Sequence, residues 1–274
     1  MTTNPADRTR SLVRNRSGAG EPLLLLHGVG ESAAGWRPIQ DALSRSFDVI
    51  VVDLPGFGAA PALPRGVAPT AAALADAIER QLDELGLSTV HIAGYSLGAR
   101  VSLELASRGR ARSVVAIAPD GLGTPVERVY ETATLLGRRF LANVLAPVAR
   151  EVTSTRTGRA AFFGSDRSRP WQLTADDAHD LLLSFAKSPA FVPTVLTGMW
   201  DIIRGISEIS CPVLIVQGLT DPLIASQSPR YLALLPQAQL QMLPNLSHVP
   251  ISDDPTLIAK LIVDFAAVER PLAA

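Results

Sequence analysis

The sequence predicts an α/β fold, in which a mostly parallel, doubly wound β-sheet carries an inserted block of helices. Short apolar runs alternate with amphipathic stretches of helical period along the 274-residue chain. Most of these runs are apolar at successive positions, which is typical of strands buried on both faces of a parallel sheet. The alternation stops between residues 121 and 206 and then resumes. We therefore expect a helical insertion within one α/β domain.

Six apolar runs are predicted as strands. The last of them alternates apolar and polar residues, so it suits an edge strand with one face in water. In chain order the runs are Pro22–Gly28, Phe47–Gly56, Thr89–Ser96, Ser113–Gly121, Cys211–Gly218 and Ala238–Pro244.

Helices are predicted between these runs from the spacing of apolar residues and from helix-end signals. The helix predicted over Pro69–Gly86 ends at a glycine, and a second runs from Ser96 to Gly109. Near the end of the sequence, Asp254 is the predicted N-cap of a third helix, with Pro255 at its first position. We expect residues 1–120 and 207–274 to form the two parts of one core, and residues 121–206 to form the insertion.

Composition excludes several classes of protein. Hydrophobic residues make up 47% of the chain and charged residues 19%, so the chain as a whole is not intrinsically disordered. Lys and Arg total 25 against 26 for Asp and Glu, which leaves no bulk positive charge for nucleic acid or an anionic membrane surface. Cys211 is the only cysteine, so an intrachain disulfide and a multi-cysteine zinc site are excluded, and we expect its thiol to be buried.

No apolar run approaches the ~20 residues that a membrane span needs, and the first residues contain no apolar segment of a secretion signal. We therefore expect a cytoplasmic protein whose partner is a small-molecule substrate, with no membrane or nucleic-acid partner. The sequence does not indicate an oligomeric state.

The strongest functional signal is Gly94-Tyr95-Ser96-Leu97-Gly98, which joins a predicted strand to a predicted helix. In that setting a G-x-S-x-G motif places a serine nucleophile on a strained turn. The glycines are needed because bulky neighbours would clash there, and the strain lifts the serine oxygen out of the end of the sheet. The N-terminus of the following helix favours negative charge that develops nearby. Ser96 is therefore the candidate nucleophile.

With this motif in its predicted setting, the chain resembles the α/β-hydrolase superfamily. It is most similar to compact bacterial members with a helical cap, which include esterases, cofactor-free haloperoxidases and C–C bond hydrolases. The resemblance extends over nearly the whole chain and is strongest in residues 23–60, 90–118 and 212–267. It implies the α/β-hydrolase fold, with residues 121–206 as the cap, and chemistry without a cofactor or metal.

The same resemblance implies an oxyanion hole made of two backbone amides. The turn His27-Gly28-Val29-Gly30 follows the first predicted strand, and by motif the amide of Val29 is one donor. The other is the amide of Leu97, which directly follows the nucleophile. His27 itself is expected to be structural rather than a general base.

The remaining members of a catalytic triad are a base and an acid. His248 lies in the loop between the last predicted strand and the last helix, where the family carries its catalytic histidine. Asp221 follows a buried strand and gives the order Ser96, Asp221, His248 that is usual in this fold. Asp120, which ends the strand before the insertion, is the rival acid.

Other chemistries are not supported. Gly28 and Gly30 lack a third glycine at Ala33, so the dinucleotide-binding motif G-x-G-x-x-G is incomplete. The sequence contains no P-loop motif, no H-E-x-x-H motif and no metal-ligand spacing of its histidines. A serine rather than an aspartate at the nucleophile position argues against the epoxide-hydrolase and haloalkane-dehalogenase branches of the superfamily.

The insertion is expected to select the substrate. Its aromatic residues either line an apolar pocket over Ser96 or bury the insertion against the core, and the second interpretation is favoured for any single residue. They are Tyr130, Phe140, Phe162, Phe163, Trp171, Phe185, Phe191 and Trp200, together with Met199. The arginines of the insertion are expected mainly on a solvated face. They are Arg138, Arg139, Arg156, Arg159, Arg167 and Arg169.

These residues predict a serine hydrolase that acts on a carboxylic ester through an acyl-enzyme. C–C bond cleavage would use the same residues and stays open. A lyase of the menaquinone pathway is a further alternative, because Gly94–Arg100 resembles its elbow with Arg100 as an anion-binding residue, although Ala99 replaces a glycine. A small-molecule receptor that uses the same fold without catalysis is the alternative from another class.

Overall fold

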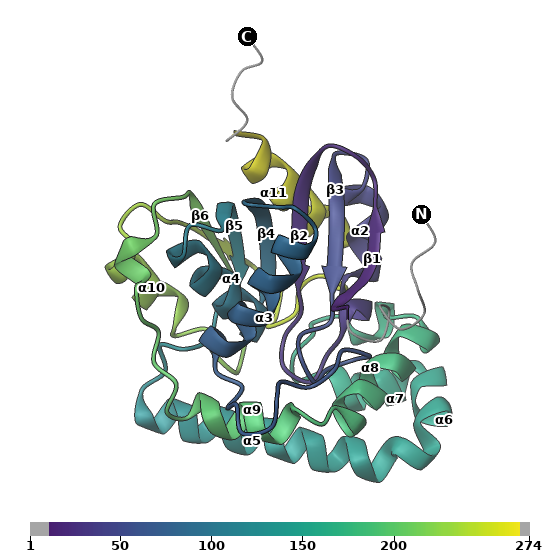
Figure 1. Ribbon diagram of the computed structural model, residues 1–274. Coiled ribbons are helices and arrows are strands. Elements are labelled where there is room, and N and C mark those ends of the chain that lie inside the picture. Colours follow the sequence, from purple (N-terminus) through teal and green to yellow (C-terminus); the bar gives the residue numbers. More distant parts are fainter. Residues whose placement is uncertain (1–10, 269–274) are drawn as a thin grey trace.

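The computed structural model describes residues 11–268, among which seven strands form one sheet in the order β1-β3-β2-β4-β5-β6-β7 (Figure 1). Only β1 runs antiparallel to its neighbour, and the other strand pairs are parallel. The predicted fold class is confirmed, and all six apolar runs form strands. The strands are β1 (Val13–Ser17), β2 (Glu21–Leu26), β3 (Phe47–Val52), β4 (Val90–Tyr95), β5 (Ala111–Ile117), β6 (Val213–Gly218) and β7 (Gln239–Leu243).

Strand β1 was not predicted from the sequence. It pairs with β3 at one edge of the sheet, and four of its five residues are polar. A polar strand is tolerated there because one of its edges faces water, and its Arg16 forms an ion pair at 2.6 Å with Asp48 of the neighbouring β3. Such a strand has no continuous apolar run, which is the signal that identified the other six.

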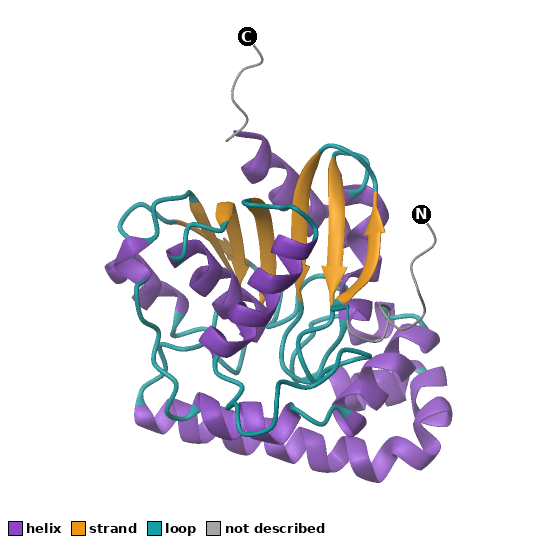
Figure 2. Cartoon of the chain, viewed as in Figure 1, coloured by secondary structure: helices purple, strands orange, loops and turns teal. Residues whose placement is uncertain are grey.

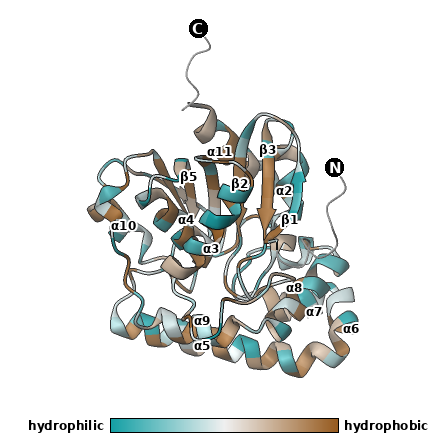
Figure 3. Cartoon of the chain, in the orientation of Figure 1, coloured by the Kyte–Doolittle hydropathy of each residue, from teal (hydrophilic) through white to brown (hydrophobic). Residues whose placement is uncertain are grey.

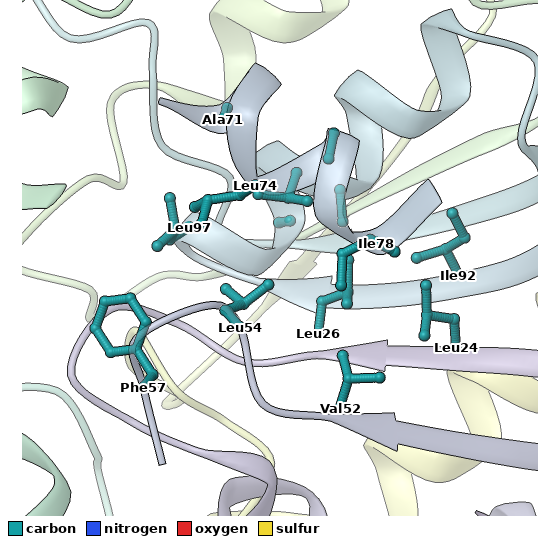
Figure 4. Close-up of a cluster of buried hydrophobic side chains, with 14 of the residues drawn as sticks. Leu24, Leu26, Val52, Leu54, Phe57, Ala71, Leu74, Ile78, Ile92 and Leu97 are labelled. Atoms are coloured by element: carbon teal, nitrogen blue, oxygen red, sulfur yellow. The ribbon is translucent and has the colours of Figure 1, made fainter. Parts of the chain in front are cut away.

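Helices cover both faces of the sheet (Figures 1 and 2). Side chains alternate along each strand, so Leu24 and Leu26 join one buried cluster with α3 and α4, whereas Leu23 and Leu25 join a second with α2 and α11. Figure 4 shows the first cluster, with Leu74 of α3 above the strands. These helices are α2 (Arg37–Leu43), α3 (Ala71–Glu84), α4 (Leu97–Ser107), α10 (Ser228–Leu234) and α11 (Pro255–Val268), with the 3-10 turn η1 (Ala33–Trp36).

The helix ends agree with the signals in the sequence. In α3 the hydroxyl of Thr70 accepts a hydrogen bond from the amide of Ala73 at 3.1 Å, and the helix stops just before Gly86, whose φ is +71°. Helix α11 begins at Pro255, and the carboxylate of Asp254 accepts from the amide of Leu257 at 3.0 Å. The predicted N-cap is therefore confirmed.

Between β5 and β6 the described chain forms helices and no strand. These helices lie in a layer beyond the carboxyl ends of the strands (Figure 1), and polar and apolar residues are interspersed along α5 (Figure 3). Their buried side chains, such as Phe162 and Phe185, share one cluster with a face of the sheet. The division of the chain at residues 120 and 206 stays a prediction. The inserted helices are α5 (Pro125–Leu145), α6 (Ala149–Ser154), α7 (Arg156–Phe163), α8 (Ala175–Lys187) and α9 (Phe191–Gly198), with 3-10 turns η2 (Ala146–Val148), η3 (Pro170–Gln172) and η4 (Ile206–Glu208).

Two expectations from composition can be compared with the structure. Cys211 is half-buried rather than buried, because it lies just before β6, where the chain comes to the surface. Within residues 11–268 no single helix is both long enough and apolar enough to cross a membrane. Helices α8 and α9 meet these two criteria only when they are taken together, and a bend of 71° separates them.

Candidate active site

Ser96 occupies the turn between β4 and α4. Its φ of 53° and ψ of −124° are unfavourable for a residue with a side chain, and its amide donates to the carbonyl of Ile117 at 2.9 Å. A Cβ atom on Gly94 would lie 2.4 Å from the carbonyl oxygen of Gly98, and one on Gly98 would lie 2.2 Å from that of Leu26. The glycines of the motif are therefore required by close backbone packing, as the sequence indicated.

Gly98→Ala is expected to destabilise the protein by about 3 kcal/mol or more, because the new methyl group meets rigid backbone that cannot move aside. Gly137→Ala is the matched control, since Gly137 lies within α5 with no atom within 4 Å of an added Cβ. That change should stabilise the helix by about 1 kcal/mol. Urea denaturation followed by circular dichroism measures both, and equal stability of the two variants would contradict the packing described for this turn.

The acid and base predicted from the sequence meet beyond the ends of β6 and β7. The Nδ1 atom of His248 lies 2.9 Å from Oδ2 of Asp221, and both side chains are buried. Three further donors fix the carboxylate of Asp221. Its Oδ1 accepts from the amides of Leu223 and Ile224 at 2.7 and 3.2 Å, and its Oδ2 accepts from the amide side chain of Gln217 at 2.9 Å. With Nδ1 held in this way, Nε2 of His248 is left as the working nitrogen.

Burial and ion pairing act in opposite directions on this pair. Burial would raise the pKa of Asp221, but the charge of His248 and the hydrogen bonds outweigh it and lower that pKa to about 2. Burial would lower the pKa of His248, but Asp221 outweighs it through its charge and hydrogen bond, so that pKa lies above its ordinary value of 6.5. Asp221 is therefore a carboxylate throughout the range in which His248 titrates.

Ser96 and His248 line the same cavity, which has a volume of about 280 Å³. The inserted helices contribute Leu135 and Phe185 to its wall, so a substrate above Ser96 would contact them. The lining residues are Gly28, Val29, Glu31, Tyr95, Ser96, Leu135, Arg138, Asp166, Phe185, Leu223, His248 and Val249.

A second cavity, of about 580 Å³, adjoins the first and shares Val29 and Leu135 with it. Leu97 also lines this second cavity, so both residues predicted to supply oxyanion-hole amides border it, and Val29 borders the Ser96 cavity as well. The structure thus brings Ser96, Asp221, His248, Val29 and Leu97 together, and their catalytic roles stay predictions.

The residues that the sequence offered as an alternative base, acid or anion-binding group, namely His27, Asp120 and Arg100, do not contact the Asp221–His248 pair through a hydrogen bond within residues 11–268. Nε2 of His27 accepts from the amide of Leu54 at 2.9 Å, and its Nδ1 lies 2.8 Å from the carbonyl of Gly28, so this ring ties two turns together. Asp120 lines the second cavity, and burial raises its pKa. Arg100 lines it too, but it is buried and lies 2.8 Å from Asp201.

The aromatic residues of the insertion divide into two groups. Phe162, Phe163, Phe185 and Phe191 are buried, and of these Phe185 lines the cavity of Ser96. Tyr130, Phe140, Trp171 and Trp200 are exposed. Burial against the core, the favoured interpretation, therefore holds for part of the set.

The expectation of a solvated arginine face is wrong for Arg138, Arg159 and Arg167, which are buried or nearly so. Each is tolerated because carboxylates or carbonyls bind its guanidinium. Sequence reasoning also missed Glu31 and Asp166, which line the Ser96 cavity. No local pattern identifies these residues, because Glu31 and its partner Arg167 are 136 positions apart.

Comparisons with known proteins show the family to which the chain belongs. The family model described as the alpha/beta hydrolase family matches residues 23–261. The epoxide hydrolase EphH of Mycobacterium tuberculosis is 32% identical over 210 residues, which cover 72% of this chain and 94% of that protein. A 2-hydroxy-6-oxo-6-phenylhexa-2,4-dienoate hydrolase of Burkholderia cepacia is 25% identical over 272 residues, which cover 92% of this chain and 90% of that protein.

Among solved structures, a thermophilic esterase from Thermogutta terrifontis shares the fold with a TM-score of 0.72 at 22% identity, over 94% of this chain and 93% of the esterase. The family match spans most of the chain, and the relative from M. tuberculosis is matched over nearly its full length. The chain is therefore an enzyme of the alpha/beta hydrolase family.

Proposed function

We propose that this enzyme hydrolyses carboxylic esters of small apolar or aromatic acids through an acyl-enzyme on Ser96. The observation that carries the proposal is a strained serine that shares one cavity with a buried histidine, whose other ring nitrogen is hydrogen-bonded to a buried aspartate. A nucleophile, a base and a group that orients the base are the three parts that acyl transfer needs.

In this mechanism Ser96 Oγ attacks the ester carbonyl carbon while Nε2 of His248 takes its proton. The amides of Val29 and Leu97 bind the oxygen that becomes negative, as backbone donors of an oxyanion hole do. The tetrahedral intermediate then breaks its bond to the alcohol oxygen, and His248 returns the proton to that oxygen. Water, activated by His248, attacks the acyl-enzyme and releases the acid.

The identity of the nucleophile favours esters over epoxides, although one relative is named an epoxide hydrolase. Attack of a serine hydroxyl on an epoxide carbon would leave an ether on the enzyme, which water does not cleave in such a site. An aspartate would leave an ester, which water does cleave. Ser96 therefore supports acyl transfer, in which the covalent intermediate can turn over.

C–C bond hydrolysis is the second candidate, because the relative from B. cepacia that is named for such a substrate covers 92% of this chain. It would use the same Ser96, Asp221 and His248. The lyase alternative has less support, since Asp201 already offsets the charge of Arg100.

The test is a series of p-nitrophenyl esters from acetyl to dodecanoyl, with initial rates corrected for uncatalysed hydrolysis. We expect the highest kcat/KM for short acyl groups, because Leu135 and Phe185 of the inserted helices lie in the wall of the cavity at Ser96 and limit its length. A fluorophosphonate should add once per chain, on the peptide that contains Ser96. Turnover of an aromatic epoxide but of no ester, or labelling at another residue, would overturn the proposal.

A further inference from the structure

Residues 166–169, between α7 and η3, connect the inserted helices to the loop that carries His248. The amide of Val249, the residue after His248, donates to the carbonyl of Asp166 at 2.8 Å. The carboxylate of Asp253 accepts from the amides of Ser168 and Arg169 at 2.7 and 2.8 Å. The histidine loop is therefore bound directly to the insertion.

The side chain of Arg167 continues these contacts into the interior. It is 1% exposed, and its Nη2 lies 2.6 Å from Oε1 of Glu31. Its Nε donates to the hydroxyl of Ser252 at 3.2 Å, and its Nη1 donates to Oδ2 of Asp166 at 3.0 Å. The guanidinium also lies 5.2 Å from the ring centre of Phe163, so every side of it is occupied.

Glu31 carries the connection to the other two catalytic segments. It follows Val29 by two residues, in the turn predicted to supply an oxyanion-hole amide. Its Oε2 accepts from the hydroxyl of Tyr95 at 2.5 Å, and Tyr95 directly precedes Ser96. Burial raises the pKa of Tyr95 well above its ordinary value, with Glu31 adding to the effect, so the hydroxyl stays protonated and keeps donating.

We propose that Arg167 is a positioning residue, which holds the Ser96 turn, the Val29 turn and the His248 loop in their catalytic arrangement through Glu31, Tyr95 and Ser252. Arg167 does not line the Ser96 cavity, whereas Glu31, Tyr95 and Asp166 do. It therefore acts through the residues that form the cavity wall. A strained turn such as that of Ser96 keeps its conformation only when its surroundings hold it.

Arg159 shows what a purely structural arginine of the same insertion looks like. It is also buried, but its guanidinium donates to carbonyl oxygens of Thr153 and Ser154, at 2.6 and 3.2 Å, and of Trp171. All of these belong to the inserted segment. Arg159→Lys is therefore the matched control, because it makes the same change of side chain without touching the three catalytic segments.

The inference rests on the proposed ester hydrolysis, whose kcat is the readout. We expect Arg167→Lys to lower kcat by about 100-fold, as small displacements of reacting groups do, with KM changed less than about threefold. Lysine keeps the charge but cannot bind Glu31, Ser252 and Asp166 together. Arg159→Lys should keep kcat within about twofold of the wild type. Rates are compared after circular dichroism shows that each variant is folded.

Tyr95→Phe tests the same role of Glu31 by a smaller change, the loss of one hydroxyl. We expect Tyr95→Phe to lower kcat about tenfold. The double variant Tyr95→Phe/Arg167→Lys should have a kcat within about twofold of that of Arg167→Lys alone, because both residues act through Glu31. The inference would be overturned if the double variant lost kcat by the product of the two single losses, or if Arg167→Lys and Arg159→Lys had equal kcat. Absence of Ser96-dependent turnover in the wild type would instead overturn the proposed function.

Discussion

Replacing Ser96 by alanine is expected to lower kcat for ester hydrolysis by about 10⁶-fold, which is the scale of losing the nucleophile of a triad that acts as a unit. The loss is large because the buried Asp221–His248 pair is proposed to act through the serine oxygen. Without the serine oxygen, His248 has no bound nucleophile to deprotonate. What remains is substrate binding and the amides of Val29 and Leu97, which retain a small part of the catalysis.

The fold should survive the Ser96→Ala change, because only one oxygen atom is removed from a cavity wall. Ser102→Ala is the matched control. Ser102 is a buried serine of α4, the helix that begins directly after Ser96, and its hydroxyl donates to the carbonyl of Gly98 at 2.7 Å. Its loss should remove a structural hydrogen bond and leave activity intact. Activity and thermal unfolding are measured on both variants. Retention of a tenth of the wild-type kcat by Ser96→Ala would exclude the serine mechanism.

The sequence was sufficient for features that depend on local spacing. Continuous apolar runs predicted β2 to β6, because a parallel strand is buried on both faces, and the alternating run predicted the edge strand β7. The G-x-S-x-G pattern predicted the Ser96 turn, since only glycines at 94 and 98 allow the backbone to approach so closely. The resemblance to the α/β-hydrolase superfamily, and not local spacing, predicted that Asp221 and His248 would meet, and they do.

Features that depend on contacts between distant segments were not predictable in this way. Arg167 gave no signal of burial, because its partners Glu31 and Ser252 lie 136 and 85 positions away. An arginine in a polar stretch is ordinarily solvated, and only the folded chain places carboxylates on both sides of it. Strand β1 was missed for a related reason: its stability comes from pairing with β3 and not from its own composition.

Asp221→Asn is expected to lower kcat by about 10⁴-fold while the protein stays folded. Oδ1 of Asp221 accepts from two backbone amides, those of Leu223 and Ile224. In the variant the amide oxygen must keep that place, so the NH₂ group takes the place of Oδ2, opposite Nδ1 of His248. Nδ1 then has to accept a hydrogen bond, which puts the proton on Nε2. That tautomer cannot take the proton of Ser96.

Asp120→Asn separates the two acids that the sequence offered. Asp120 lines the second cavity, and the carboxylate bonded to His248 is that of Asp221. We therefore expect Asp120→Asn to lower kcat by less than about tenfold, far less than Asp221→Asn. The rates of both variants are measured on one ester, and a larger loss in Asp120→Asn would assign the role of the acid to Asp120.

The pH dependence of Asp221→Asn tests the same pair independently of its rate. In the wild type, activity should rise with pH through a midpoint above 6.5, because His248 must lose its proton and Asp221 raises its pKa. In the variant the charge of Asp221 is gone and burial is the largest remaining influence on the pKa of His248, so the midpoint of the remaining activity should move to lower pH.

The pH dependence of unfolding tests the same pair. The pKa of Asp221 is about 2 in the folded chain against 3.8 ordinarily, so its carboxylate contributes about 2 kcal/mol above pH 3.8 that is lost as the pH falls toward 2. The raised pKa of His248 stabilises the fold below pH 6.5, and this contribution is lost as the pH rises through that raised value. Asp221→Asn removes the carboxylate contribution, so its free energy of unfolding should fall less than that of the wild type as the pH approaches 2. It also lowers the pKa of His248, so protonation of His248 should no longer stabilise the fold and the pH dependence near pH 6.5 should be lost or reversed. An unchanged midpoint of activity together with an unchanged pH dependence of unfolding would show that Asp221 and His248 do not form a charged pair.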